Sequence, residues 1–174
     1  AYHPQDMTAQ SIYLYGMTVV TTSHRLASEF PQPDHYSEIA ESHRSPGGET
    51  GTCAVVLAGL GHRIRLDGNH LGRSTYADLV QYFEPTEVSL DLMTHDPSFE
   101  CLEDIEFMDQ TSRTIFGRFC AFYDDESVRR WNSPDEDAIM NASVVGLDPF
   151  FLEDSIRAAE LCAEHKVRFV TIDC

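Results

Sequence analysis

The sequence has few basic side chains and almost no lysine. Twelve Lys and Arg residues stand against 29 Asp and Glu residues, which gives a formal net charge of −17 at pH 7, and Lys166 is the only lysine. This charge disfavours nucleic acid or an anionic membrane surface as a partner, because both would repel the protein. Solubility is the simpler interpretation of the charge, and the scarcity of lysine fits either genome composition or a salt-rich environment.

Targeting segments and cysteine motifs are missing as well. No stretch approaches 18 consecutive apolar residues, and the polar residues 1–10 lack a signal-peptide core, so we expect neither a membrane span nor secretion and infer a cytoplasmic location. The five cysteines are widely spaced and form no C-x-x-C, which disfavours a disulfide framework or a zinc knuckle. Buried free thiols in a reducing compartment are the expected alternative.

Common catalytic motifs are absent too. The eight histidines form no H-E-x-x-H or similar spacing, so we expect no metal site. There is no G-x-S-x-G elbow to support a hydrolase, and no P-loop lysine. The one glycine-rich stretch does not read G-x-G-x-x-G and has no strand leading directly into it, which disfavours a dinucleotide site.

That glycine-rich stretch is the most informative feature present. Residues 46–54 read PGGETGTCA and run into an apolar helix predicted over residues 49–60. Because Gly47 and Gly48 have no Cβ, a ligand can approach their backbone closely. The first helical turn adds unpaired N–H groups at its positive end. The loop therefore predicts a site for hydroxyls or an anion, and the alternative is a tight turn that only feeds the helix.

The rest of the chain alternates apolar strands with helices. Buried strands are predicted over 12–20, 63–67, 143–147 and 167–172, and a further strand over 87–93. Helices are predicted over 74–83 with Ser74 as N-cap, from Ser133 with Pro134 at the first position, and over 152–165 with Ile156, Ala159, Leu161 and Cys162 toward the core.

Two polar segments, 24–30 and 35–42, and a hairpin of 105–108 with 113–123 around residues 109–112 complete the pattern. This order predicts one α/β domain over residues 1–174: an open, mostly parallel sheet flanked by helices, with a small β lid over about 23–43 and 101–123. A core strand at 167–172 with nothing after it would leave a bare sheet edge. Either another chain covers that edge, or the sequence is the first half of something longer.

Three segments together resemble the N-terminal signature of the PfkB/ribokinase family of carbohydrate kinases. They are Gly47-Gly48-x-x-x-Thr52-x-Ala54, the helix end at residues 57–61 (LAGLG), and residues 66–72 (LDGNHLG). The resemblance extends over nearly the whole chain but over only about half of the family's usual length. It implies a ribokinase-like fold, truncated before the ATP-binding half. No Gly-Ala-Gly-Asp motif and no Asn-x-x-Glu element is present, so ATP and Mg²⁺ are expected only for a full-length kinase and this chain is expected to hold no cofactor and no catalytic residue.

The resemblance also implies site residues. It assigns Gly47 and Gly48 to the contact with a sugar or polyol, and Asp148 to a position where some members place a sugar-binding acid. Thr52 stands where the family usually has asparagine, Thr21-Thr22-Ser23 where it has an aspartate, and Ser74 where an acid is expected. These departures leave the identity of the sugar open.

Each of these residues also has a structural alternative. Thr52 donates its hydroxyl either to a ligand or to the first helical turn. Asp148 precedes Pro149 and could accept two sugar hydroxyls or cap the following turn. Phe150 and Phe151 would stack on a sugar or belong to the core. Arg113 and Arg118 would meet an anion or a partner subunit, or pair with local acids such as Asp109 or Asp124.

Two functions follow as expectations. The first is the substrate-binding and lid half of an ATP-dependent sugar kinase, a phosphotransferase to an alcohol group, without turnover of its own. The second is a non-catalytic sugar-binding or protein-interaction module derived from that fold. Both predict a small sugar or polyol or a protein as the partner, with a homodimer through the lid or the exposed sheet edge.

Overall fold

The computed structural model describes residues 11–100, 102–119 and 128–172, and their strands form two sheets. The body sheet has the order β5-β4-β1-β8-β9, and all its neighbours are parallel. Its strands are β1 (Ser11–Gly16), β4 (Ile64–Gly68), β5 (Val88–Ser89), β8 (Ala142–Leu147) and β9 (Phe169–Thr171). The open parallel sheet predicted from the sequence is thereby confirmed.

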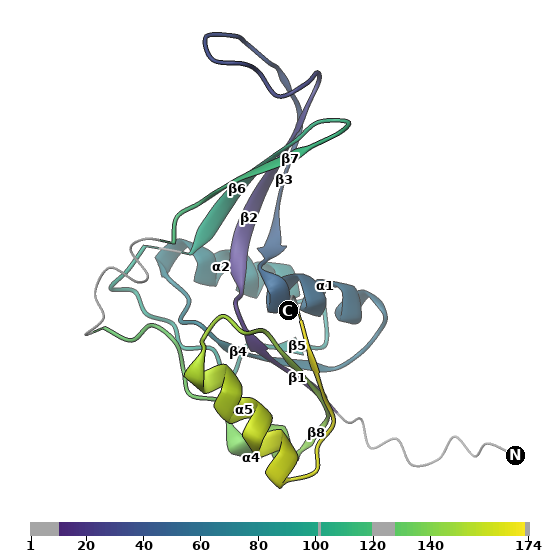
Figure 1. Ribbon diagram of the computed structural model, residues 1–174, viewed down its shortest axis with the longest axis vertical. Coiled ribbons are helices and arrows are strands. Elements are labelled where there is room, and N and C mark those ends of the chain that lie inside the picture. Colours follow the sequence, from purple (N-terminus) through teal and green to yellow (C-terminus); the bar gives the residue numbers. More distant parts are fainter. Residues whose placement is uncertain (1–10, 101, 120–127, 173–174) are drawn as a thin grey trace, which may run out of the picture.

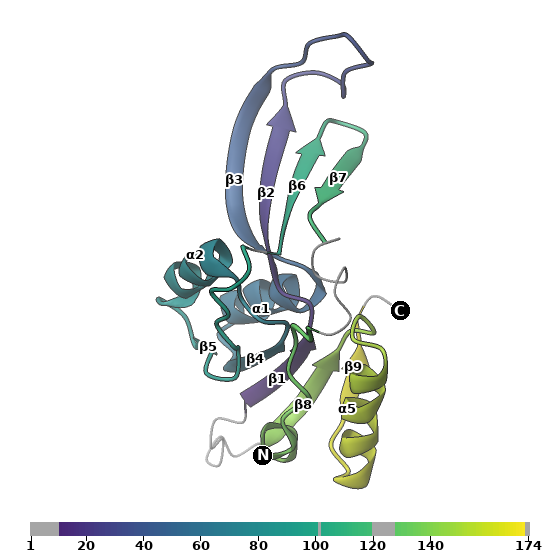
Figure 2. The same ribbon diagram turned by 90° about the vertical axis from the view of Figure 1, so that its left-hand side faces the viewer.

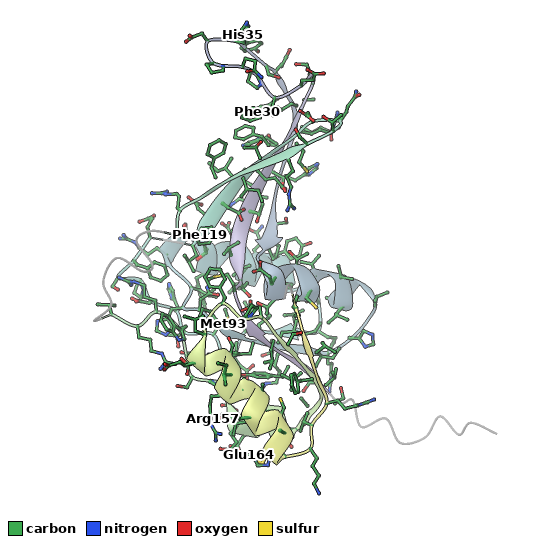
Figure 3. All side chains as sticks on the ribbon, viewed as in Figure 1. Phe30, His35, Met93, Phe119, Arg157 and Glu164 are labelled. Atoms are coloured by element: carbon green, nitrogen blue, oxygen red, sulfur yellow. The ribbon has the colours of Figure 1, made fainter. Side chains whose placement is uncertain are left out.

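The second sheet, which we call the lid, rises from the body as a separate blade (Figure 1). It has the order β3-β2-β6-β7, and its strands are β2 (Val19–Leu26), β3 (Ile39–Gly47), β6 (Glu103–Met108) and β7 (Arg113–Gly117). Figure 3 shows His35 at the outer end of the lid, and Arg157 and Glu164 on a helix at the opposite end of the molecule.

Helices cover both faces of the body sheet (Figure 2). On one face lie α1 (Glu49–Gly59) and α2 (Arg73–Phe83); on the other lie α4 (Glu136–Met140) and α5 (Glu153–Glu164). Strand β1 serves both cores because its side chains alternate: Leu14 packs on the α1 side, and Tyr13 and Tyr15 pack on the α5 side. None of the helices described is long and apolar enough to cross a membrane.

The first apolar run is divided between the two sheets. We predicted one buried strand over 12–20, but β1 ends at Gly16 and β2 begins at Val19. Met17 and Thr18, which we call the body–lid junction, are both buried, at 2% and 1% exposure. Hydropathy cannot reveal this break, because the residues stay buried while the chain passes from one sheet to the other.

Two predicted helix caps are wrong. Gly72, not Ser74, is the N-cap of α2, and the Ser74 hydroxyl instead donates to the Glu100 carbonyl at 3.4 Å. Helix α4 begins later than predicted, with Asp135 as its N-cap: the Asp135 carboxylate accepts from the Ala138 N–H at 2.6 Å. The Asp135 carboxylate reaches an N–H group of the first turn, so Asp135 caps the helix and Ser133 does not.

Two predictions of burial near the end of the chain are also wrong. Ile156 of α5 is 61% exposed, whereas Leu161 and Cys162 are buried as predicted and Ala159 packs against the core. Ser155 and Ala158 complete the buried face of the helix. Strand β9 is exposed along its whole length. It pairs with β8 on one side only, so residues 169–171 form an edge and not the buried strand that their hydropathy predicted.

The predicted lid hairpin is present, because β6 pairs antiparallel with β7. Asp109 closes the turn, because its Oδ1 accepts from the backbone N–H groups of Thr111 and Ser112, both at 2.7 Å. Its Oδ2 accepts from the Phe30 N–H at 3.0 Å, which ties the two lid hairpins together. The second strand ends at Gly117, and residues 120–123 of the predicted strand lie outside the described part of the chain.

Candidate functional site

A cavity of about 730 Å³ lies between the lid and the N-terminus of α1. The strands of the lid supply one wall, the glycine turn and α1 supply another, and Ile172 beyond β9 contributes the remaining edge. Its lining comprises Thr21, Ser23, Ser45, Pro46, Gly47, Gly48, Glu49, Thr52, Val55, Val56, Asp104, Glu106, Arg113, Ile115 and Ile172. Three of the four residues predicted to bind substrate, Gly47, Gly48 and Thr52, therefore meet in one cavity.

The two glycines of this turn are also required by the packing of the chain. Gly48 is the N-cap of α1 and has φ +74°, and a Cβ there would lie 2.5 Å from the Met17 carbonyl oxygen. At Gly47 a Cβ would lie 1.9 Å from the Thr21 hydroxyl. A side chain at Gly48 is therefore disfavoured twice, by the left-handed backbone and by the close approach of the body–lid junction. The turn presents backbone to the cavity and at the same time lets α1 pack on that junction.

Thr52 stands one turn into α1 and is exposed toward the cavity. Its backbone N–H already donates to the Gly48 carbonyl at 2.9 Å, as the helix requires. The first-turn threonine that bonds locally is Thr50, whose hydroxyl donates to the Met17 carbonyl at 2.7 Å and lies 3.0 Å from the Thr18 hydroxyl. Of the two threonines, Thr52 is the one that lines the cavity.

Asp148 does not join the other predicted residues. It is 1% exposed, its Oδ2 accepts from the Met17 N–H at 2.5 Å, and its Oδ1 accepts from the Phe150 N–H at 2.9 Å. It lines a separate apolar pocket of about 250 Å³ with Leu152 and Ile156. This arrangement matches the capping alternative for Asp148 and adds a contact that the sequence did not suggest, the bond to the body–lid junction. A substrate-binding role for Asp148 stays a prediction.

The adjacent phenylalanines differ in their environment. Phe151 is buried, lies parallel to Trp131 with ring centroids 5.5 Å apart, and meets Tyr15 edge to face. Phe150 is exposed. Phe151 is therefore part of the core.

The body–lid junction is held by side chains from three distant elements. The Asn69 amide pairs with both backbone groups of Thr18: its Oδ1 accepts from the N–H at 2.7 Å and its Nδ2 donates to the C=O at 2.8 Å. Asp148, directly after β8, accepts from the Met17 N–H, and Thr50 of α1 donates to the Met17 carbonyl. These bonds fix the point from which the lid leaves the body.

A second buried polar group lies at the end of β4. Asp67 is 1% exposed, and its carboxylate accepts from the Tyr13 hydroxyl at 2.7 Å, the Gly68 N–H at 2.7 Å and the Asn132 amide at 3.1 Å. Burial raises the pKa of Asp67 above its ordinary value, although these hydrogen bonds oppose the shift. The carboxylate joins β1, β4 and the segment before α4.

Two acids of the lid line the cavity although their place there was not predicted. Asp104 and Glu106 stand two residues apart on β6 and line the cavity with Thr21 and Ser23, their partners on β2. Glu106 accepts from the Ser23 hydroxyl at 2.8 Å and pairs with Arg113 at 3.2 Å. Arg113 thus has an acid partner, but it is Glu106 and not Asp109, and Arg118 pairs with Glu103. The alternation of acids in residues 103–106 was a signal that could have placed Asp104 and Glu106 on one face.

The part of the chain that the structure describes brings no three His, Cys, Asp or Glu side chains close enough together to hold a metal ion. The sequence also matches no family model and no curated protein.

Several solved structures share the fold of this chain. A fructokinase from Halothermothrix orenii superimposes with a TM-score of 0.72 at 15% identity, covering 92% of this chain and 56% of its own. A ribokinase from Arabidopsis thaliana, complexed with ribose and ATP, gives a TM-score of 0.67 at 14% identity, covering 94% and 53%. A nucleoside kinase from Methanocaldococcus jannaschii, an archaeal member of the ribokinase family, gives 0.64 at 17% identity, covering 87% and 48%. The chain therefore has the ribokinase-type α/β fold and spans about half the length of these proteins.

Proposed function

We propose that this chain, with its ribokinase-type fold, is the acceptor-binding and lid half of a carbohydrate kinase. The observation that carries the proposal is the cavity itself: backbone at Gly47 and Gly48, the hydroxyl of Thr52, and the polar face of the lid line one space at the N-terminus of α1. Hydroxyl, carboxylate and backbone groups at this density suit a small polyol, which offers many donors and acceptors.

In this proposal the residues of the chain position the acceptor. The glycine turn and Thr52 would bind one side of the polyol, and Thr21, Ser23 and Ser45 of the lid would bind the other. A lid that covers the polyol would exclude water and hold the reacting hydroxyl in place. Asp148 would act from outside the cavity, through its bond to Met17, unless its carboxylate is released from the backbone.

The phosphoryl-transfer step is not assigned to these residues. ATP with Mg²⁺ would supply the transferred group in a complete kinase. Because the sequence lacks the Gly-Ala-Gly-Asp motif, we expect the chain by itself to show no turnover.

Titration calorimetry with free sugars tests the proposal. We expect at least one of ribose, fructose, glucose and a purine nucleoside to bind the 174-residue chain. The Thr52→Leu variant should weaken that binding by roughly tenfold or more, because the larger apolar side chain occupies the cavity and removes a donor. Thr52 is exposed on α1, so the fold should tolerate the change. Thr114→Leu, on the lid but outside the lining, is the matched control. Absence of binding to every ligand of the panel would refute the proposal.

A non-catalytic interaction module is the second candidate, and a different surface favours it. The lid face turned away from the cavity carries Ile105 and Phe116 directly opposite one another on β6 and β7, at 37% and 53% exposure. Ile39 on β3 adds a third exposed apolar side chain, at 46%. We propose that this face forms a homodimer, with the β9 edge as the alternative interface.

A further inference from the structure

The cavity is lined by more negative than positive charge. Glu49 from α1 and Asp104 and Glu106 from β6 provide three carboxylates, and Arg113 provides one guanidinium. Since Arg113 is paired with Glu106, its charge is already balanced within the lid. Asp104 and Glu49 therefore leave the cavity net negative.

The two lid acids differ in how far their hydrogen-bonding capacity is used. Glu106 is 9% exposed and has partners on both oxygens, Ser23 and Arg113. Asp104 has an oxygen, Oδ1, that is buried and has no hydrogen-bond partner among the described residues. Native proteins rarely leave a buried polar atom unpaired, and those that do often reserve it for a ligand or water.

The surroundings of Asp104 show what kind of ligand group would suit it. Burial raises the pKa of Asp104, the Thr21 hydroxyl opposes that shift by hydrogen bonding, and the charge of Glu106 adds to it. A carboxylate in such a place gains from a donor, and gains most from a cationic donor, because an opposite charge stabilises its ionised form. An anionic ligand group would meet repulsion from Asp104 and Glu49.

We propose that Asp104 determines substrate specificity in this cavity: a turn of its side chain brings the buried, unpaired oxygen to the cavity, where the carboxylate accepts a hydrogen bond from a hydroxyl or an ammonium group. The cavity would then take neutral and amino-bearing polyols and reject phosphorylated ones. This inference rests on the proposed function, the binding of a polyol between the lid and the glycine turn. It goes further in naming the charge class of the substrate and the residue that selects it.

The test compares one sugar in three charge states. Glucose, glucosamine and glucose 6-phosphate, and likewise ribose with ribose 5-phosphate, are titrated into the 174-residue chain by calorimetry at neutral pH and low salt. We expect the amino sugar to bind at least as tightly as the neutral sugar, and the phosphate esters to bind more than about tenfold more weakly. In Asp104→Asn the advantage of the amino sugar should disappear and the discrimination against the esters should narrow several-fold.

A matched control separates the local effect from net charge. Glu38→Gln removes the same charge from an exposed position of the lid outside the lining, and should leave all affinities unchanged. If Asp104→Asn does not fold, the ranking of the three ligands by the wild-type chain decides the question. Tight binding of the phosphate esters, or affinities that Asp104→Asn leaves unchanged, would overturn this inference while the proposed function stands. Failure of every sugar to bind would instead remove the proposed function.

Discussion

The side-chain amide of Asn69 pairs with both backbone groups of Thr18, accepting from the N–H at 2.7 Å and donating to the C=O at 2.8 Å. Asn69 follows β4, and Thr18 lies where the chain leaves the body sheet for the lid. The amide thus takes the place of a neighbouring strand at a point where no ladder continues. Four predictions concern this junction, the glycine turn, the two aspartates Asp67 and Asp109, and the lid.

Replacing Asn69 should be costly. Asn69→Ala leaves the buried N–H and C=O of Thr18 without partners, and we expect a loss of about 2–4 kcal/mol in the free energy of unfolding. Urea denaturation followed by the fluorescence of Trp131, the single tryptophan, measures it. Asn141→Ala, at an exposed asparagine that bonds the Asp137 carbonyl, is the control and should cost much less. Equal effects of the two variants would show that the Asn69–Thr18 pairing does not hold the junction.

Alanine substitutions at Gly48 and Gly59, at the two ends of α1, should change the stability of the protein in opposite directions. Gly48→Ala places a Cβ 2.5 Å from the Met17 carbonyl at a φ of +74°, and should destabilise the protein by about 2 kcal/mol or more. In Gly59→Ala the new Cβ meets nothing within 4 Å, and the substitution should stabilise by about 0.5–1 kcal/mol, because alanine loses less entropy on folding. Thermal unfolding of both variants provides the comparison. A tolerated Gly48→Ala would contradict the close approach of this turn to the Met17 carbonyl.

The pKa of Asp67 should lie above the ordinary aspartate pKa, and the pKa of Asp109 should lie below it. Burial raises the pKa of Asp67 in the folded state, so the ionised carboxylate destabilises the fold. This destabilisation diminishes as the pH falls through the pKa of the folded state toward the pKa of the unfolded state. Hydrogen bonds from the backbone N–H of Thr111 and then of Phe30 lower the pKa of Asp109. Ionised Asp109 therefore stabilises the fold fully above the pKa of the unfolded state. This stabilisation is lost as the pH falls toward and through the lower pKa of the folded state. Carboxyl-carbon NMR titration, with Asp67→Asn and Asp109→Asn to assign the two signals, checks both directions. The same direction for the two groups would contradict the assignment.

The outer lid face should mediate self-association. Phe116→Glu places a charge among exposed apolar side chains, and Ile105→Glu does the same on the opposing strand; each should weaken a dimer by more than about tenfold. Light scattering across a concentration series measures the association. Val170→Lys on the β9 edge tests the alternative interface, and an effect confined to that variant would move the dimer from the lid to the body sheet. A monomer at all concentrations would exclude both interfaces.

The local features of the fold were accessible from the sequence. Apolar runs located β1, β4 and β8, the glycine loop located the start of α1, and Asp109 marked the turn of the lid hairpin. These features depend on residues close together in the chain. The helix caps were predicted less well. Asp135 and Ser133 are both acceptable N-caps, and only the path of the chain into α4 decides between them.

The cavity was predicted in part. Gly47, Gly48 and Thr52 belong to one loop and helix, so their proximity follows from local structure. Asp104 and Glu106 are more than 50 residues further along, and they face that loop only because β6 pairs with β2 in a particular register. A register shifted by one residue would turn both acids to the opposite face.

The sequence by itself determined the parallel α/β architecture and the glycine turn at α1, since periodicity and backbone freedom are properties of neighbouring residues. Tertiary structure alone decided that Asp148 binds the Met17 backbone, that β9 is an exposed edge, and that the acids of β6 line the cavity. The physical reason is that a buried polar group takes whichever partner the packing of distant strands brings within 3 Å, and no local pattern encodes that choice.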